Sequence, residues 1–134
     1  MADRYIVEPA EGWFELKRGK QSWRAPARGE THHIEIVPIE AATGRLVPQV
    51  PVTLEVLDAQ GKRVARSALR PYYAEFFHYA ENFSLPAADD YTLKATVGAP
   101  ALRRHGEQSE RPPLAEGAQV EFKGVRLEPR EGER

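Results

Sequence analysis

Residues 90–97 read Asp-Tyr-Thr-Leu-Lys-Ala-Thr-Val, and this stretch decides the fold class. Apolar side chains occupy every second position from Tyr91 to Val97, which is the period of a strand with one buried face. A tyrosine that enters a strand after a polar turn is typical of the tyrosine corner of immunoglobulin-like sandwiches, where its hydroxyl bonds to nearby backbone. The alternative is an ordinary strand tyrosine. Either way, the stretch predicts a β-strand.

The same alternation recurs along the chain, and turn residues separate the runs. Residues 52–57 and 120–123 repeat the pattern, and Asp58-Ala59-Gln60-Gly61 is expected to close a hairpin between Val52–Leu57 and Arg63–Arg66. In the last of these stretches Gly124 interrupts the alternation of inward-facing residues between Phe122 and Val125, which predicts a β-bulge. Eleven prolines argue against long helices. We therefore predict an all-β, immunoglobulin-like β-sandwich of about seven or more strands.

The length of 134 residues fits a single domain, residues 1–134, and the absence of cysteine excludes disulfides and thiolate metal sites. Residues 1–30, aromatic and basic around Trp13 and Trp23, are expected to form an N-terminal extension or edge strands that cover the sandwich. Residues 98–117 form a long proline-containing loop, which is expected to be functional or mobile. Residues 128–134 are expected to be a charged, solvated tail.

Charge and hydropathy exclude several functions. Nineteen basic and 20 acidic side chains are interspersed along the chain, so the protein has no overall positive potential that would attract nucleic acid. The chain lacks the roughly 18 consecutive apolar residues of a membrane span, and its N-terminus lacks the apolar segment of a secretory signal. From the sequence as written we expect a cytoplasmic protein, or a periplasmic one if a signal has been removed. Because the familiar catalytic motifs are missing, we do not expect an enzyme.

Three separated histidines stand out in this β pattern: His33, His78 and His105. Glu35 lies two residues after His33 and points to the same side of its strand. Neutral imidazole is a good ligand for copper, zinc and iron, so a fold that brings these side chains together would make a transition-metal site. The alternative is three unrelated histidines on a small sandwich.

Several short motifs, in order, resemble the periplasmic iron-transport protein family. They are Gly-Arg-Leu-Val-Pro at 44–48, Val-Thr-Leu-Glu-Val at 52–56, Pro-Tyr-Tyr at 71–73, His-Tyr-Ala-Glu-Asn at 78–82, Asp-Tyr-Thr-Leu at 90–93, Arg-His-Gly at 104–106 and Val-Glu-Phe-Lys-Gly-Val at 120–125. The resemblance covers roughly residues 32–127. It implies a small immunoglobulin-like protein of bacterial iron uptake that holds a copper or iron ion.

The resemblance also implies the ligands. His33 matches the early-strand histidine of the family, Glu35 a glutamate at a neighbouring or alternate metal position, and His78 and His105 the two later histidines. Family members have a methionine ligand a few residues before the second histidine. Here the only methionine is Met1, and Tyr72 or Tyr73 occupies the corresponding stretch; the sequence does not decide which.

A phenol is a harder ligand than a thioether, so this replacement disfavours Cu(I) and leaves Cu(II), Zn(II) or iron open. The function expected is binding and hand-over of copper or iron in iron transport. The resemblance also implies a homodimer with the metal near the interface. The alternative is a β-sandwich interaction module that has lost the metal and docks on a partner protein through its edge strands or basic N-terminal stretch.

Overall fold

Ten strands make up the fold, and the structure, a computed structural model, describes residues 1–129. The strands are β1 (Ala2–Pro9), β2 (Trp13–Lys17), β3 (Lys20–Arg24), β4 (His32–Ile39), β5 (Val52–Leu57), β6 (Arg63–Ala68), β7 (Arg70–Tyr73), β8 (Phe77–Phe83), β9 (Asp89–Val97) and β10 (Ala118–Leu127). Within the described residues, no helix is long and apolar enough to cross a bilayer.

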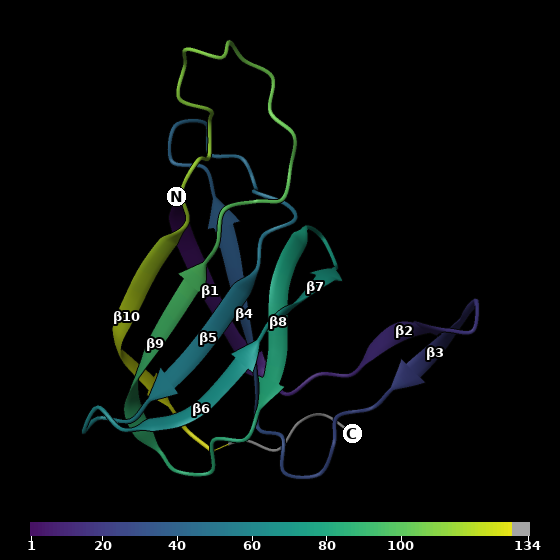
Figure 1. Ribbon diagram of the computed structural model, residues 1–134. Coiled ribbons are helices and arrows are strands. Elements are labelled where there is room, and N and C mark those ends of the chain that lie inside the picture. Colours follow the sequence, from purple (N-terminus) through teal and green to yellow (C-terminus); the bar gives the residue numbers. More distant parts are fainter. Residues whose placement is uncertain (130–134) are drawn as a thin grey trace.

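Two four-stranded antiparallel sheets pack face to face as a sandwich (Figure 1). One sheet has the order β1-β4-β8-β7 and the other the order β10-β9-β5-β6. Alternate residues of the strands meet between the sheets, and the most deeply buried include Ile34, Ile36, Leu54, Val56, Leu93 and Ala95. The predicted all-β, immunoglobulin-like sandwich is therefore confirmed.

The local signals read from the sequence are also found in the structure. The Tyr91 hydroxyl donates a hydrogen bond to the Ala87 carbonyl oxygen at 2.5 Å, which is the bond of a tyrosine corner. The pairing of β10 with β9 shifts register between Phe122 and Val125, and Gly124 adopts a φ of 66°. That positive φ, which glycine adopts at little cost, accounts for the predicted bulge.

Strand β4 is buried on both of its faces, although the sequence pattern predicted burial of one. Ile34 and Ile36 enter the core, whereas His33 and Glu35 lie on the opposite face and are nevertheless 1% and 7% exposed. Burial of this polar pair requires cover from other parts of the chain. The outer face of this sheet is therefore the place to look for a site.

The N-terminal segment divides into two parts. Strand β1 forms an edge of the first sheet, but residues 13–16 do not add the expected edge strand to the sandwich. They belong to β2, which within the described residues pairs only with β3, so the two make a hairpin that projects from the sandwich (Figure 1). Residues 1–30 thus contain both an edge strand, β1, and an extension, the β2–β3 hairpin, and the sequence does not show which strand pairs with residues 13–17.

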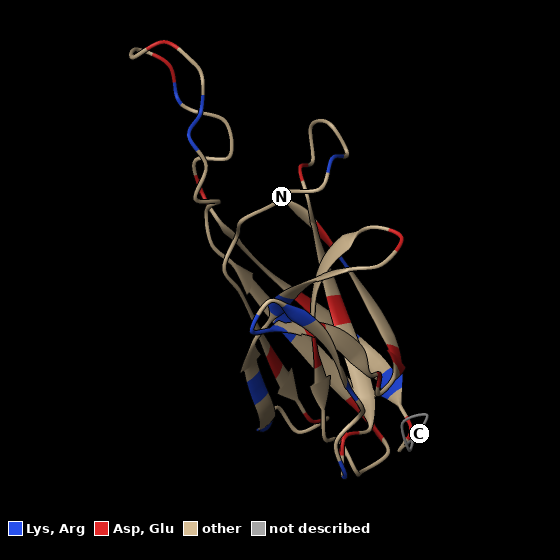
Figure 2. Ribbon diagram, turned by 90° about the vertical axis from the view of Figure 1, so that its right-hand side faces the viewer, with Lys and Arg blue, Asp and Glu red and all other residues tan. Residues whose placement is uncertain are grey.

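The loop of residues 98–117 contains no strand and extends beyond one end of the sandwich (Figure 1). The Arg104 guanidinium orders part of it by donating to the carbonyl oxygens of Pro100, Leu102, Pro113 and Leu114. Of the expected charged tail, residues 130–134 lie outside the described residues. Basic and acidic residues are interspersed over the molecule, as the composition indicated (Figure 2).

Candidate metal centre

Strand register brings the polar residues of the outer face into adjacent positions. His33 of β4 lies opposite Glu8 of β1 on one side and Asn82 of β8 on the other. His78 of β8 lies opposite Tyr72 of β7. Because directly paired residues of antiparallel strands share a face, these side chains form one continuous polar and aromatic surface.

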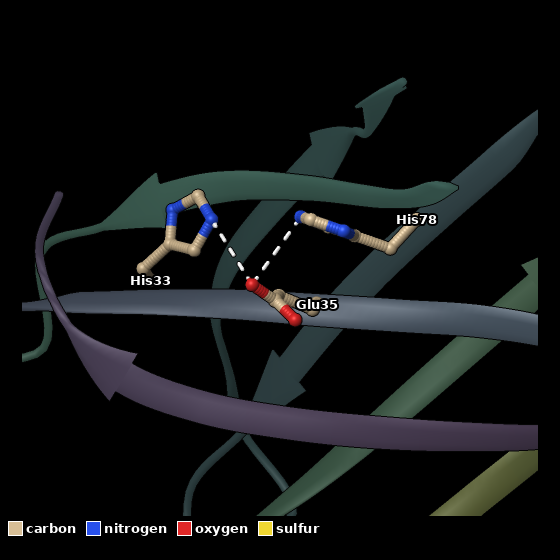
Figure 3. A group of neighbouring side chains, drawn as sticks. All are labelled: His33, Glu35 and His78. Atoms are coloured by element: carbon tan, nitrogen blue, oxygen red, sulfur yellow. Dashed lines mark ion pairs between the residues drawn. The ribbon is translucent and has the colours of Figure 1, made fainter. Parts of the chain in front are cut away.

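His33, Glu35 and His78 converge on this surface (Figure 3). Glu35 Oε1 lies 3.2 Å from His78 Nε2 and 3.7 Å from His33 Nε2. One ligand atom from each of the three side chains lies within 4.8 Å of the other two, and all three residues are buried. The structure thus brings together three of the four histidine and glutamate side chains that the sequence nominated. Two imidazole nitrogens and a carboxylate oxygen are a donor set suited to a transition-metal ion.

Asn82 determines the tautomer of His33. The Asn82 side-chain NH₂ donates to the Glu11 carbonyl oxygen at 2.8 Å and to Glu30 Oε1 at 3.0 Å, and both partners only accept. The Asn82 side-chain oxygen therefore faces His33 Nδ1 at 2.8 Å, so that nitrogen carries the proton and donates. In the neutral ring the lone pair of His33 is then on Nε2, which is buried and has no hydrogen-bond partner among the described residues. A buried acceptor without a donor is costly, and a cation at this position would satisfy it.

The ring of His78 also directs its Nε2 toward the centre. Its Nδ1 lies 3.3 Å from the Phe76 carbonyl oxygen, an acceptor, so Nδ1 is the protonated nitrogen and Nε2 faces Glu35. Burial lowers the pKa of His78, which favours the neutral form that ligates metals. Burial also raises the pKa of Glu35, with a smaller contribution from Glu8, and the neighbouring His33 acts in the opposite direction. A bound cation would add a further positive charge beside this buried carboxylate.

The raised pKa of Glu35 leads to a prediction for the metal-free protein. The unfolded chain releases this proton near the ordinary glutamate pKa of 4.5, whereas the folded protein retains it to higher pH. Its contribution to stability is complete below the unfolded pKa and is lost as the pH rises through the folded pKa. We expect Glu35→Gln to be more stable than the wild type at about pH 7, and the gain to disappear at about pH 4.

Urea denaturation of both proteins in the presence of a chelator, followed by circular dichroism, measures this difference. Glu107→Gln, an exposed change of the same type, serves as the control and is expected to leave stability unchanged at both pH values. A Glu35→Gln protein that is less stable than the wild type at neutral pH would show that the carboxylate has a favourable partner in the metal-free fold.

The structure separates the two candidate tyrosines. The Tyr72 ring stacks on His78 with centroids 5.9 Å apart and meets the edge of His33 at 5.4 Å. The Tyr73 side chain is 77% exposed and contacts Phe77 instead. Neighbouring strand residues point to opposite faces, so only one of the two tyrosines can lie against the imidazoles. That residue is Tyr72.

Tyr72 contributes its ring to the centre rather than its oxygen. Burial raises the pKa of its hydroxyl well above the usual value, with a further contribution from Glu81. The positive charges of Arg70 and Arg24 act in the opposite direction. The Tyr72 hydroxyl oxygen is buried and has no hydrogen-bond partner of good geometry among the described residues. Arg70 nevertheless lowers the pKa of this hydroxyl in part. A phenolate ligand is therefore disfavoured in the metal-free protein.

His105 does not join His33 and His78 within one chain. It is exposed in the loop of residues 98–117, and the described group of metal-compatible side chains around Glu35 does not include it. The loop extends beyond the end of the sandwich (Figure 1), whereas the other two histidines belong to β4 and β8, neighbouring strands of one sheet. The fourth histidine, His32, points to the other side of β4, where its Nε2 lies 2.7 Å from the Glu128 carbonyl oxygen.

Two further carboxylates adjoin the centre that the sequence analysis did not nominate. Glu8, Glu11 and Glu35 form a second group with oxygens within 4.8 Å of one another, and Glu11 Oε2 lies 3.6 Å from His33 Nε2. No sequence motif marks Glu8 or Glu11. The register of β1 against β4 places Glu8 here, and the hydrogen bonds of the Glu11 backbone to the Asn82 side chain hold Glu11 beside it. Asn82 ends the His-Tyr-Ala-Glu-Asn stretch at 78–82, and only the structure shows that its side chain bonds to His33.

The centre opens into a cleft of about 1000 Å³ on the outer face of the sheet. The β2–β3 hairpin forms one wall through Trp13, Phe14 and Trp23, and the β7–β8 turn forms another through Tyr73 and Phe76. Aromatic walls around a few polar groups are typical of small-ligand sites. The ligand group thus has access to solvent through the cleft.

The fold and the donor set define a class: a small β-sandwich protein with a buried histidine and carboxylate cluster compatible with a transition-metal ion. Residues 28–125 match the family described as Fe2+ transport protein. The chain belongs to this family, which confirms the resemblance seen in its motifs. No sequence among the curated proteins matches the chain.

Solved structures have the same fold. A copper-bound variant of FetP from uropathogenic Escherichia coli strain F11 superposes with a TM-score of 0.66 at 18% identity, covering 93% of this chain and 85% of that one. A copper-bound variant of P19 from Campylobacter jejuni gives a TM-score of 0.67 at 17% identity, covering 92% and 88%. Copper-reconstituted P19 gives 0.60 at 16% identity, covering 90% and 98%.

Proposed function

We propose that this protein binds a copper or iron ion through His33, His78 and Glu35 and serves iron transport by capturing the ion and handing it over. The observation that carries the proposal is the buried Nε2 of His33, which has no hydrogen-bond partner among the described residues and points into a group of donors within 4.8 Å of one another. A bound cation would pair this lone pair and balance the buried carboxylate. Membership of the Fe2+ transport protein family and copper in the similar structures support it.

The donor set favours some ions over others. Imidazole and carboxylate suit Cu(II) and Fe(II), whereas Cu(I) prefers the thiolate or thioether sulfur that this cluster lacks. Tyr72 supplies an aromatic ring where the family resemblance predicts a methionine. We therefore propose that the ion is held in a divalent state.

A homodimer would bring His105 to the centre. The loop that carries His105 projects from the sandwich (Figure 1). We propose that the loop of one copy lies against the cleft of the other and adds a third imidazole there. The family resemblance, which implies dimers with the metal near the interface, supports this arrangement. It also supports a location outside the cytoplasm, which fractionation of the source cells would test.

Metal analysis of the native protein tests the proposal. We expect protein purified without an affinity tag or chelator to contain copper or iron in stoichiometric amount, or to take it up in titration calorimetry. Protein that binds neither ion and instead co-purifies with a partner protein would support the interaction module and reject the metal site.

The His105→Ala variant tests the contribution of a second copy. At concentrations where sedimentation shows a dimer, we expect the variant to bind Cu(II) more weakly than the wild type, because one imidazole is missing. Where both proteins are monomeric, we expect equal affinities. Equal affinities at every concentration would remove His105 from the site.

A further inference from the structure

A single side chain connects the proposed metal ligand His33 to the base of the β2–β3 hairpin. Asn82 accepts a hydrogen bond from His33 Nδ1 at 2.8 Å and another from the Glu11 backbone N–H at 3.2 Å. Its NH₂ group donates to the Glu11 carbonyl oxygen and to Glu30 Oε1. Glu11 precedes the hairpin and Glu30 follows it, so Asn82 bonds to both segments that join the hairpin to the sandwich.

The hairpin itself depends on side chains for its position. In the described part of the chain its strands form a sheet of their own, without pairing to the sandwich. Arg24 of β3 donates to Glu30 with two nitrogens, at 2.6 and 2.8 Å, and this pairing lowers the pKa of Glu30 to about 2. The Arg24 guanidinium also lies 4.2 Å from the centroid of the Trp13 ring.

This network continues to the aromatic ring beside the proposed ligands. Trp13 meets the edge of Tyr72 with centroids 5.2 Å apart, and Tyr72 in turn stacks on His78. In addition, Glu11 Oε2 lies 3.6 Å from His33 Nε2. The hairpin and the segments that flank it are therefore connected to the centre in three ways: Asn82 bonds to Glu11 and Glu30, Glu11 lies near His33, and Trp13 contacts Tyr72.

We propose that Asn82 is a positioning residue that couples metal occupancy at His33 to the position of the β2–β3 hairpin. An ion at His33 Nε2 requires the tautomer with the proton on Nδ1, and that tautomer completes the hydrogen bonding of Asn82 that holds the hairpin base. Because coupling between two sites is reciprocal, release of the hairpin weakens metal binding by the same factor by which the metal stabilises the docked hairpin. This inference rests on the proposed metal site.

The chain contains a built-in reporter for the hairpin. Its two tryptophans, Trp13 and Trp23, both lie on the hairpin, so intrinsic tryptophan fluorescence reports this element alone. Trypsin gives a second readout, because Lys17, Arg18 and Lys20 are exposed at the hairpin tip. Zn(II) is a suitable probe because it is redox-inactive and binds imidazole and carboxylate ligands.

In the wild type we expect Zn(II) to change the tryptophan emission and to slow cleavage at the hairpin tip. Arg24→Ala acts on the hairpin without touching a proposed ligand. We expect it to speed cleavage and to weaken Zn(II) binding severalfold, at the lower end of the roughly 5- to 150-fold range of such couplings. Arg66→Ala, an exposed arginine replaced on the other sheet, is the matched control and is expected to change neither readout.

Variants at position 82 distinguish the bond of Asn82 to His33 from its bonds to the base of the hairpin. Asn82→Ala removes all of the bonds, and we expect about 10- to 100-fold weaker Zn(II) binding, typical of losing a residue that orients a ligand, together with rapid cleavage. Asn82→Asp keeps an acceptor for His33 Nδ1 but places a carboxylate against Glu30. We expect its hairpin to be cleaved rapidly, and its Zn(II) affinity to exceed that of Asn82→Ala.

The outcomes distinguish this inference from the proposed function. A wild type that binds neither Zn(II), Cu(II) nor Fe(II) overturns both. A wild type that binds Zn(II), combined with an Arg24→Ala protein of equal affinity and hairpin readouts that do not respond to Zn(II), overturns the coupling and leaves the metal site intact. Circular dichroism of each variant confirms that the sandwich is folded before affinities are compared.

Discussion

Affinity for Cu(II) is expected to fall by roughly hundredfold or more when His78 is replaced by alanine. A four-ligand zinc site in a small protein binds with about 10–16 kcal/mol, or about 3 kcal/mol for each ligand, which corresponds to about two orders of magnitude in affinity. His78 Nε2 lies 3.2 Å from Glu35 Oε1, and its ring is fixed by the Phe76 carbonyl and by stacking on Tyr72. Titration calorimetry of wild type and variant measures the loss.

Glu75→Gln is the control for this experiment. Glu75 lines the same cleft on the β7–β8 turn but is exposed and lies outside the group formed by His33, Glu35 and His78. We expect its affinity for Cu(II) to equal that of the wild type. If His78→Ala and Glu75→Gln both bind as the wild type does, the ion is held elsewhere and the proposed centre is rejected.

Replacing Leu93 with alanine is expected to lower the free energy of unfolding by about 2–5 kcal/mol. Leu93 is fully buried on β9, between β10 and β5, and packs in the core between the two sheets. The variant loses the transfer free energy of its side chain and leaves a cavity that a tightly packed sandwich closes only in part. Urea denaturation followed by far-ultraviolet circular dichroism measures the change, and a lower thermal midpoint accompanies it.

Val64→Ala provides the matched comparison, because it also truncates an apolar strand residue, but one that is 44% exposed on β6. Exposed substitutions of this kind usually alter stability by less than about 0.5 kcal/mol. Equal losses for the two variants would contradict the assignment of Leu93 to the core. Tryptophan fluorescence is unsuitable here, since both tryptophans lie on the projecting hairpin.

Much of the fold could be predicted because its signals are local. Alternation from Tyr91 to Val97 marked a strand, the polar turn before Tyr91 marked the tyrosine corner, and Gly124 marked the bulge. Each depends on residues only a few positions apart, where strand geometry and backbone sterics act directly. The hairpin of β2 and β3 was missed because an aromatic and basic stretch does not identify its pairing partner.

The candidate site was predicted in part. Two histidines and a glutamate were named from the sequence and lie together, and their role as metal ligands stays a prediction. The sequence left Tyr72 and Tyr73 as alternatives, and it did not indicate Glu8, Glu11 or the part played by Asn82. It also placed His105 with the others, whereas within one chain the loop of residues 98–117 carries that residue away from them.

Local patterns in the chain therefore predicted most of the strands, the turns between them, the sandwich and the residue types from which a metal site is made. The three-dimensional fold was needed to show that His33 meets His78, that Tyr72 rather than Tyr73 lies against them, and that Asn82 faces Nδ1 of His33. The two kinds of information differ in the separation along the chain over which the interactions act. Strand propensity and turn chemistry act between near neighbours in the chain, whereas contacts between residues more than 40 positions apart depend on strand register and sheet packing, where a shift of one residue turns every side chain to the opposite face.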